Sequence, residues 1–265
     1  MTAIAVTIAG SDSSGGAGIQ ADLKTFSALG VYGASVITAL TAQNTVGVQG
    51  IHDVPADFVA MQMDSVFSDL TVNAVKIGML SKVPVIEQVA AGLDRHRMTH
   101  VVLDPVMVAA SGGKLLDADA VDALAGLLFP RALLVTPNLP EAAVLLDRPI
   151  AADETEMERQ GAALIERGAK AVLMKGGHGS GDMAVDLLVT AEATVRLSAP
   201  RLPGANNHGT GCTLSSAIAA GLAKGFALGQ SVSEAKDYVT RAIAAADRLR
   251  IGHGHGPTHH FHAFW

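Results

Sequence analysis

The chain has 265 residues, of which 49% are hydrophobic and 17% charged, and its formal net charge is −6 at pH 7. Lysines and arginines are scattered rather than clustered, which argues against a nucleic-acid partner. No apolar run is long enough to cross a bilayer, the N-terminus lacks the basic flank of a signal peptide, and one cysteine permits no internal disulfide. We therefore expect a cytoplasmic protein that acts on small molecules, with residues 1–265 forming a single domain.

Short apolar runs alternate along the chain with longer segments of helical period. The first three such pairs are runs 4–10, 31–42 and 73–79, followed by helical segments 18–30, 55–70 and 83–96. Further apolar runs follow at 100–104, 132–136 and 171–175. Continuous apolar runs are typical of strands buried on both faces of a parallel sheet. The pattern predicts an α/β fold, a three-layer α/β/α sandwich with a mostly parallel central sheet.

The region 182–197 interrupts this alternation. Two strand-like pieces, AVDLLVT and TVRLS, are separated there by residues 191–193, which predicts a hairpin added at a sheet edge. Two helices, over about 210–224 and 231–250, are predicted to close the fold.

Residues that interrupt the apolar pattern lie mostly at the ends of the predicted strands: Ser11 and Asp12, Gln43 and Asn44, Lys76 and Met79 around the third strand, Asp104, Asn138 and Lys175. In open parallel sheets, ligands bind outside the carboxyl ends of the strands. The sequence therefore predicts one ligand site at this edge.

The segment NNHGTGC, residues 206–212, leads directly into a helical pattern. Two glycines let backbone amides turn toward an anion, and the start of the helix adds the positive end of its dipole, so the segment indicates a phosphate site. Cys212 lies at the helix N-terminus, where the pKa of a thiol is lowered and a thiolate favoured. A proton acceptor beside a phosphate site suggests a kinase. The alternative is a tight turn capped by Thr210 or Asn207 above a small buried thiol.

Asp22 falls inside the apolar face of the helix that follows the glycines at 15–18. An unpaired carboxylate there is costly, so Asp22 must have a partner. The partner is either a structural ion pair or hydrogen bond, or a polar ring substituent of a substrate.

Asn138 and Glu141 have the spacing of a capping box at a helix start. Combined with Asp104, they also supply oxygen ligands suited to magnesium, directly or through water, and the two interpretations are compatible. Lys175 at a strand end can lie against phosphate oxygens, or can be a solvated lysine.

The tail 253–262 holds five of the ten histidines. It has no fixed metal-ligand spacing, so we expect a packed or interface-forming terminus that binds transition metals only adventitiously.

Eight segments together resemble the bacterial hydroxymethylpyrimidine/phosphomethylpyrimidine kinases of thiamine biosynthesis, in the ribokinase-like superfamily. They are AGSDSSGGAGIQADLKTFSALG, ITALTAQNT, KIGML, VVLDPVM, TPNLPEA, VLMKGGH, HGTGCTLSSAIAAGLA and HHFHAFW. The resemblance runs from residue 8 to residue 265, and GTGC, in place of the GTGD more usual in the superfamily, discriminates strongly. Ser13 and Phe264 depart from the family pattern, neither at a proposed catalytic atom.

The resemblance implies phosphorylation of 4-amino-5-hydroxymethyl-2-methylpyrimidine and then of its monophosphate, dependent on ATP and Mg²⁺. It also implies a homodimer and no separate lid domain. Gln43, helped by Asp22, would pair with the pyrimidine edge, and the pocket walls would be Gly10, Ala17, Met79 and Val106. The implied catalytic and phosphate-binding residues are Gly209, Thr210, Gly211, Cys212 and Lys175. Magnesium would lie near Asp104, Asn138 and Glu141.

Two alternatives stay open. Pyridoxal also carries a hydroxymethyl group on a nitrogen heterocycle, so a pyridoxal or pyridoxine kinase is the nearest rival. A pyrimidine-binding sensor that has lost catalysis is the other, although Lys175, Asp104, Glu141 and GTGC are all present. Within the kinase hypothesis, Cys212 avoids the repulsion that an aspartate would exert on an anionic second acceptor.

Overall fold

The computed structural model describes residues 1–107, 118–178, 181–202 and 206–265. Across these residues the main sheet has the strand order β10-β9-β8-β7-β6-β5-β1-β2. Neighbours from β2 to β8 pair in parallel, whereas β9 and β10 are antiparallel. The strands are β1 (Ile4–Ala9), β2 (Tyr32–Ile37), β5 (Ala74–Ile77), β6 (Val101–Leu103), β7 (Leu134–Val135), β8 (Ala171–Lys175), β9 (Met183–Thr190) and β10 (Thr194–Pro200).

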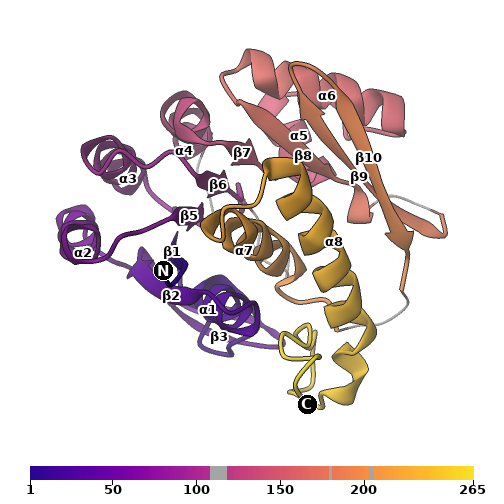
Figure 1. Cartoon of the computed structure of the whole chain (residues 1–265), viewed down its shortest axis with the longest axis horizontal. Coiled ribbons are helices and arrows are strands. Elements are labelled where there is room, and N and C mark those ends of the chain that lie inside the picture. Colours follow the sequence, from indigo (N-terminus) through magenta and orange to yellow (C-terminus); the bar gives the residue numbers. More distant parts are fainter. Residues whose placement is uncertain (108–117, 179–180, 203–205) are drawn as a thin grey trace.

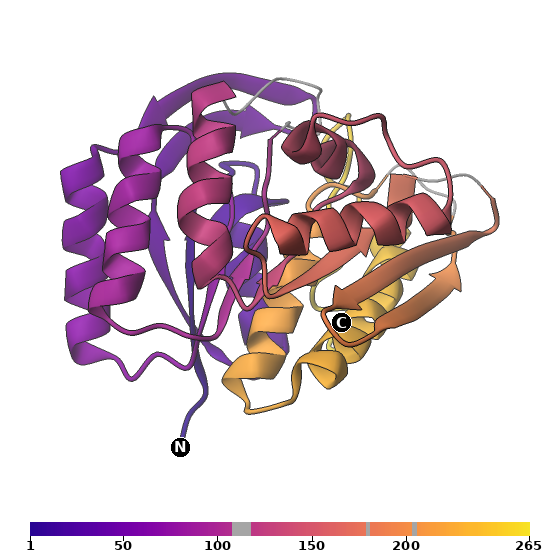
Figure 2. The same ribbon diagram turned by 90° about the horizontal axis from the view of Figure 1, so that it is seen from above.

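Helices cover both faces of this sheet (Figure 1, Figure 2). One face packs against α2 (Ala56–Asp69), α3 (Val83–Arg95), α4 (Ala118–Leu128), α5 (Leu139–Leu146) and α6 (Glu154–Glu166). The other face packs against α1 (Gly18–Ala28), α7 (Thr210–Ala223) and α8 (Leu228–Ala244). The predicted three-layer α/β/α sandwich is therefore confirmed.

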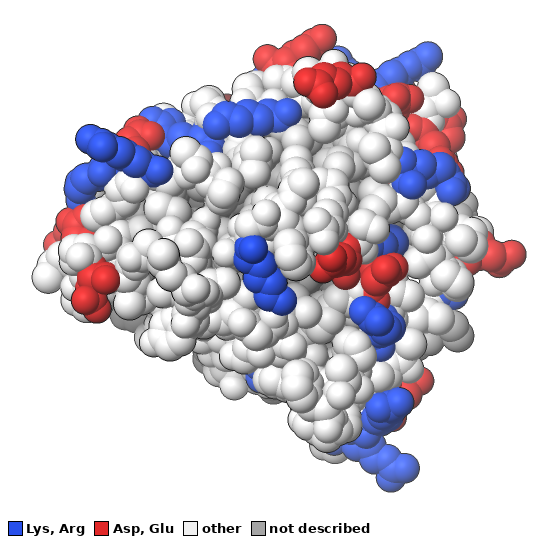
Figure 3. Space-filling view, in the orientation of Figure 1, with Lys and Arg blue, Asp and Glu red and all other residues white. Residues whose placement is uncertain are grey.

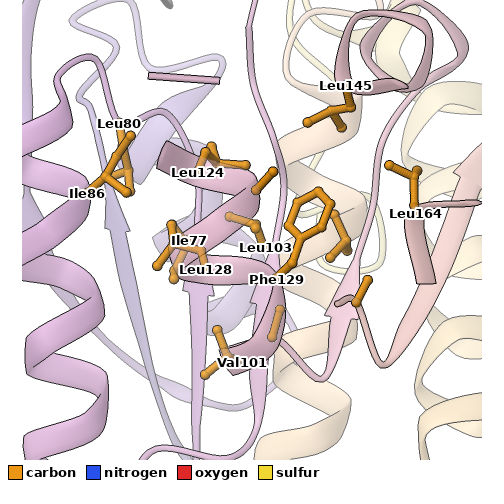
Figure 4. Close-up of a cluster of buried hydrophobic side chains, with 14 of the residues drawn as sticks. Ile77, Leu80, Ile86, Val101, Leu103, Leu124, Leu128, Phe129, Leu145 and Leu164 are labelled. Atoms are coloured by element: carbon orange, nitrogen blue, oxygen red, sulfur yellow. The ribbon is translucent and has the colours of Figure 1, made fainter. Parts of the chain in front are cut away.

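The cores on the two faces follow the strand period of two residues. In β1, Val6 and Ile8 join one cluster, while Ala5 joins the other. Figure 4 shows part of the first cluster, where Phe129 lies among Leu103, Leu128 and Leu164. All four residues of β5 are buried, as expected for a strand between two helical layers.

The apolar run 31–42, predicted as a single strand, is two strands. Thr38 lies between them: its backbone N–H makes the last bond to β1, at Ala9 O, and its hydroxyl donates to Met79 O. β3 (Ala39–Asn44) then leaves the main sheet and pairs antiparallel with β4 (Gly47–Asp53), which the sequence analysis missed. We call this two-stranded sheet, residues 39–53, the flap.

The predicted edge hairpin is confirmed as β9 and β10, at the end of the main sheet. The histidine-rich tail is packed rather than free, since residues 256–260 are buried. The described residues contain no group of three or more His, Cys, Asp or Glu side chains that could hold a metal ion.

Basic and acidic side chains are interspersed over the face shown in Figure 3, so their fields partly cancel. Within the described ranges, no helix is both long and apolar enough to span a bilayer.

Candidate active site

A cavity of about 840 Å³ lies where the parallel strands end, between the flap, the start of α7 and the β9–β10 hairpin. It is bordered by residues that follow β1, β5, β6, β7 and β8, so the ligand site predicted at the carboxyl ends of the strands corresponds to a real cavity. Every residue proposed from the sequence for catalysis, substrate, phosphate or metal lines this cavity except Asp22.

The residues expected at the pyrimidine lie together at the flap end, namely Gly10, Ala17, Gln43, Met79 and Val106. The backbone of Gln43 is fixed by Ser13, whose hydroxyl donates to Gln43 O and accepts from Gln43 N, each at 2.8 Å. A proline at position 13 could make neither bond. The departure at Ser13 therefore lies closer to the candidate site than the sequence analysis allowed.

Asp22 does not face the cavity. Its side chain is fully buried, and Lys76 Nζ lies 2.9 Å from both of its carboxylate oxygens. The hydroxyls of Thr7 and Ser216 also donate to Asp22, both at 2.6 Å. Thr7 and Lys76 are register partners on β1 and β5, which brings both to the same carboxylate. The structural interpretation of Asp22 holds, and the expected contact with a substrate ring is corrected, because no acceptor oxygen is left to face one.

Two further residues line the flap end: Asp12, which was expected only as one of the polar residues at this edge, and His208, which was given no role from the sequence. His208 Nε2 lies 2.8 Å from Asp12 Oδ2, and both side chains are buried. The same oxygen accepts from the backbone of Gly16 and Ala17 at the entry to α1. Burial raises the pKa of Asp12, but hydrogen bonds from His208 and Ser14 outweigh it and hold that pKa well below its usual range. In the sequence, the position of His208 directly before Gly209 is the signal that could have identified it as a site residue.

The start of α7 faces the cavity without a side-chain cap. Gly209 is the N-cap residue, at φ 78°, and Thr210 Oγ1 donates to Asn207 O rather than closing the first turn. The tight turn that the alternative interpretation expected is present, since both the N–H and the hydroxyl of Thr210 donate to Asn207 O, but no side chain caps the helix. Uncapped amides at a helix start are the groups that bind anions, and Gly209, Thr210 and Gly211 all line the cavity.

The Cys212 side chain is a neutral thiol rather than the thiolate expected from its helix position. Burial raises the pKa of Cys212 to about 11, although the nearby ammonium of Lys76 acts in the opposite direction. Desolvation of the charged form thus outweighs the helix terminus. The sequence could not reveal this, because the depth of the pocket comes from segments far from residue 212.

Lys175 lies between two buried carboxylates and is not a solvated strand-end lysine. Its Nζ donates to Asp104 Oδ1 at 2.7 Å and lies 3.9 Å from Glu141 Oε2. Asp104 also accepts from the hydroxyls of Thr136 and Ser215. Burial lowers the pKa of Lys175, but the charges of Asp104 and Glu141 raise it by more, so the net shift is upward. The Lys175 ammonium therefore stays charged beside the cavity.

The predicted capping box at α5 is confirmed. Asn138 Oδ1 accepts from Glu141 N at 2.8 Å, and Glu141 Oε2 accepts from Asn138 N at 2.7 Å. Burial raises the pKa of Glu141 to about 7, with Lys175 opposing and Asp104 adding to the shift. The box therefore holds a carboxyl group at the cavity wall, next to Asp104 and Lys175.

The far end of the cavity, lined by the hairpin and α8, was missed by the sequence analysis. Its lining includes the apolar residues Pro200, Leu202, Val239 and Ile243. Lys236 and Asp186 also line this end of the cavity, and they form an ion pair at 2.7 Å. The available signal was the spacing of Val239 and Ile243, four residues apart on one face of α8.

Comparison with known proteins agrees with the family resemblance found in the sequence. The family model described as phosphomethylpyrimidine kinase matches residues 12–259. The hydroxymethylpyrimidine/phosphomethylpyrimidine kinase of Rhizobium meliloti is 63% identical over 265 residues, which cover 100% of this chain and 99% of that protein.

Two solved structures resemble this one closely. Phosphomethylpyrimidine kinase from Clostridium difficile has a TM-score of 0.80 at 44% identity, covering 91% of this chain and 99% of that one. An ADP complex of Bacillus subtilis pyridoxal kinase has a TM-score of 0.91 at 35% identity, covering 98% of each chain. Because the family model matches nearly the whole length and a relative is 63% identical over the full chain, the chain belongs to the phosphomethylpyrimidine kinase family.

Proposed function

We propose that the cavity transfers the γ-phosphoryl group of ATP to the hydroxymethyl group of 4-amino-5-hydroxymethyl-2-methylpyrimidine, and then a second one to the resulting monophosphate, in thiamine biosynthesis. The observation that carries the proposal is that the uncapped start of α7 and the Lys175 ammonium face the same cavity as Gln43. The pyrimidine lies at the flap end, with Gln43 at its ring edge. ATP enters from the end lined by the hairpin and α8.

Phosphoryl transfer passes through a loose transition state, so positioning and charge stabilisation contribute most. Lys175 and the amides of Gly209, Gly211 and Cys212 surround the position of the transferring oxygens, and Thr210 lies beside them. The acceptor hydroxyl lies against the neutral thiol of Cys212, which excludes water and adds no charge. Once the new P–O bond has largely formed, its proton passes to an oxygen of the transferred phosphoryl group and from there to solvent. In the second step the acceptor is an ionised phosphate and needs no base.

The residues near Lys175 fit Mg²⁺. This ion is usually held by one or two carboxylates together with substrate phosphates and water, and Asp104 and Glu141 are two buried carboxyl groups on one cavity wall. Asp104 and Glu141 would hold the ion, while Asn138, whose amide oxygen is used by the capping box, would fix Glu141 in place. Bound Mg²⁺ supplies neutralisation of phosphate charge. Activity lost with EDTA and restored by excess Mg²⁺ is the expected result, and undiminished turnover in EDTA would contradict it.

The proposal is tested by incubating the protein with ATP, Mg²⁺ and the pyrimidine alcohol, and by following the products by mass. We expect the monophosphate and then the pyrophosphate. Lys175→Met should lower the rate on the order of 100-fold, the scale seen when one charge-stabilising donor is lost. Lys170→Met, which removes an exposed lysine near the same strand, should leave it unchanged. No phosphorylated product from the unaltered protein would refute the proposal.

Pyridoxal kinase activity is a second candidate, favoured by the close structural match to Bacillus subtilis pyridoxal kinase. The same assay with pyridoxal in parallel decides between them. Pyridoxal phosphate alone would assign the chain to that activity, whereas both products would make pyridoxal a side substrate.

The homodimer implied by the family resemblance and the cytoplasmic location expected from the composition are also proposals. Light scattering on the purified protein tests the first, with a mass near twice 27.1 kDa expected. Fractionation of the source cells tests the second.

A further inference from the structure

The histidine-rich tail packs along the edge of the cavity, and the proposed function does not explain it. Residues 253–260, which we call the C-terminal strap, follow α8 and lie near the flap in Figure 1. His255 in this strap lines the cavity. The strap is hydrogen-bonded to both sides of the acceptor pocket and to the helices beneath it.

At one end the strap holds the turn of the flap. The backbone N–H groups of His253 and Gly254 donate to Thr45 Oγ1, each at 3.2 Å. The N–H of His255 donates to Thr45 O at 2.9 Å. Thr45 follows Gln43 by two residues, so these bonds fix the part of the flap that carries Gln43.

In its middle the strap holds the loop before α7. His208 N donates to Gly256 O at 3.1 Å, and Thr258 N donates to His208 O at 3.4 Å. Both backbone polar groups of His208 are therefore bonded to the strap, and the next residue is Gly209. The His208 side chain continues the connection to Asp12.

At its other end the strap is anchored in the core. Tyr238 OH donates to His260 O at 2.6 Å, and His259 N donates to Ala242 O at 3.0 Å. The His260 ring nitrogen Nε2 lies 3.1 Å from Thr213 Oγ1, whose hydrogen is donated to Gly209 O. The ring nitrogen must therefore be the donor in the His260 contact. The strap is thus connected to Gly209 in two ways, through the preceding residue His208 and through Thr213, which donates to Gly209 O.

We propose that the C-terminal strap positions the phosphoryl acceptor, by fixing the distance between Gln43 on the flap and the amides at Gly209. The proposal deepens the proposed function and rests on it. Each bond to Thr45 is exposed and contributes modestly to stability. Displacement of reacting groups by about 1 Å can still cost about 100-fold in rate. The strap therefore acts on catalysis more than on folding, and its residues are positioning residues.

The test substitutes Gly254 and compares it with a second glycine. A Cβ at Gly254 would overlap Thr45 O and push the strap from the flap, whereas a Cβ at Gly50, on the flap itself, meets its nearest atom at 3.9 Å. We expect Gly254→Ala to raise KM for the pyrimidine alcohol about 10-fold, with KM for ATP and Tm unchanged. Gly50→Ala should match the unaltered protein.

Thr45 provides an independent pair of variants should Gly254→Ala fail to fold. Thr45→Val removes the hydroxyl that accepts two strap N–H groups, and Thr45→Ser keeps it. The valine variant should show the same selective rise in KM, and the serine variant should not. Unchanged KM in both Gly254→Ala and Thr45→Val, with an active unaltered protein, would overturn the strap proposal alone. Inactivity of the unaltered protein and of Gly50→Ala would overturn the proposed function instead.

Discussion

Cys212 shows how burial changes the chemistry that a motif suggests. The helix start and Lys76 favour a thiolate, but desolvation raises the pKa of Cys212 to about 11, so the group is uncharged at neutral pH. A neutral group at this place serves two acceptors of different charge. The first acceptor is an alcohol, and the second is a phosphate that a nearby carboxylate would repel.

Cys212→Asp tests this hypothesis. If the aspartate is ionised, the second phosphorylation should fall at least 10-fold more than the first, since about 1.4 kcal/mol of repulsion corresponds to a factor of ten. The rates are measured separately with the alcohol and with the monophosphate. Cys212→Ser, which stays neutral, should lower both steps by a similar factor. A second step that survives Cys212→Asp as well as the first would show that charge at this position is unimportant.

The buried pair of Asp22 and Lys76 belongs to stability rather than to substrate binding. Asp22→Asn keeps the shape but leaves the Lys76 ammonium buried without its counter-charge, and we expect a loss of about 3 kcal/mol in the free energy of unfolding. Urea titration measures it. Asp64→Asn, which weakens the ion pairs of an exposed carboxylate with Arg95 and His96, should cost much less. A neutral result for Asp22→Asn would show that the pair does not stabilise the fold.

Among the elements, α7 has glycines at both ends with similar backbone strain and different surroundings. Gly209 (φ 78°) starts the helix, and a Cβ there would overlap Gly16 O. Gly225 (φ 86°) follows the helix, and a Cβ there meets nothing within 4 Å. The difference between the two sites is the contact with the loop before α1, on the wall of the cavity.

Gly209→Ala should therefore lower kcat on the order of 100-fold by displacing the amides at the start of α7. Gly225→Ala carries the same conformational strain, about 1 kcal/mol, and should lower Tm without changing kcat. Steady-state kinetics and thermal unfolding of both variants separate the two effects. Equal kcat losses at the two ends would mean that strain, not the position of the amides, is responsible.

The flap shows where element prediction from sequence reaches its limit. Apolar periodicity identified the buried strands of the main sheet because those strands are covered on both faces. β4 is largely exposed and rich in glycine, so it has no comparable pattern. The break at Thr38 depends on partners in β1 and near Met79, which no local signal contains.

At the scale of the whole molecule, the site was predictable where a residue follows a strand and unpredictable where its environment is assembled from several segments. Asp104, Asn138 and Lys175 lie where the strand ends placed them. The isolation of Asp22 requires three distant partners, and the desolvation of Cys212 requires the segments that surround it in the cavity. His208 needed the strap and Asp12 before its place in the site became visible.

Stability of the whole fold should depend on pH through His260. Burial lowers the pKa of His260 to about 4, with further lowering by Lys24 and His259. The unfolded chain binds a proton at this histidine below about pH 6.5 while the folded chain does not, so the contribution of His260 to stability is lost as pH falls from about 6.5 to about 4. Glu141, whose pKa burial raises to about 7, contributes in the opposite direction over this range, so the effect of His260 is read from the difference between variants. The slope contributed by one such group is about 1.4 kcal/mol per pH unit.

Urea unfolding between pH 7.5 and 4.5 measures this dependence. His260→Gln should reduce the slope, whereas His100→Gln, at an exposed position, should not. An unchanged slope in His260→Gln would assign the pH dependence to other groups.

The bonds from the strap to Thr45 and His208 also have a consequence for the order in which the protein is made. The chain is synthesised from its N-terminus, so the flap and α7 emerge from the ribosome before residues 253–260 do. The acceptor pocket is thus completed by residues that are translated after its other walls. A nascent or prematurely terminated chain can have its sheet and its nucleotide end in place and still lack the contacts that close the pyrimidine pocket.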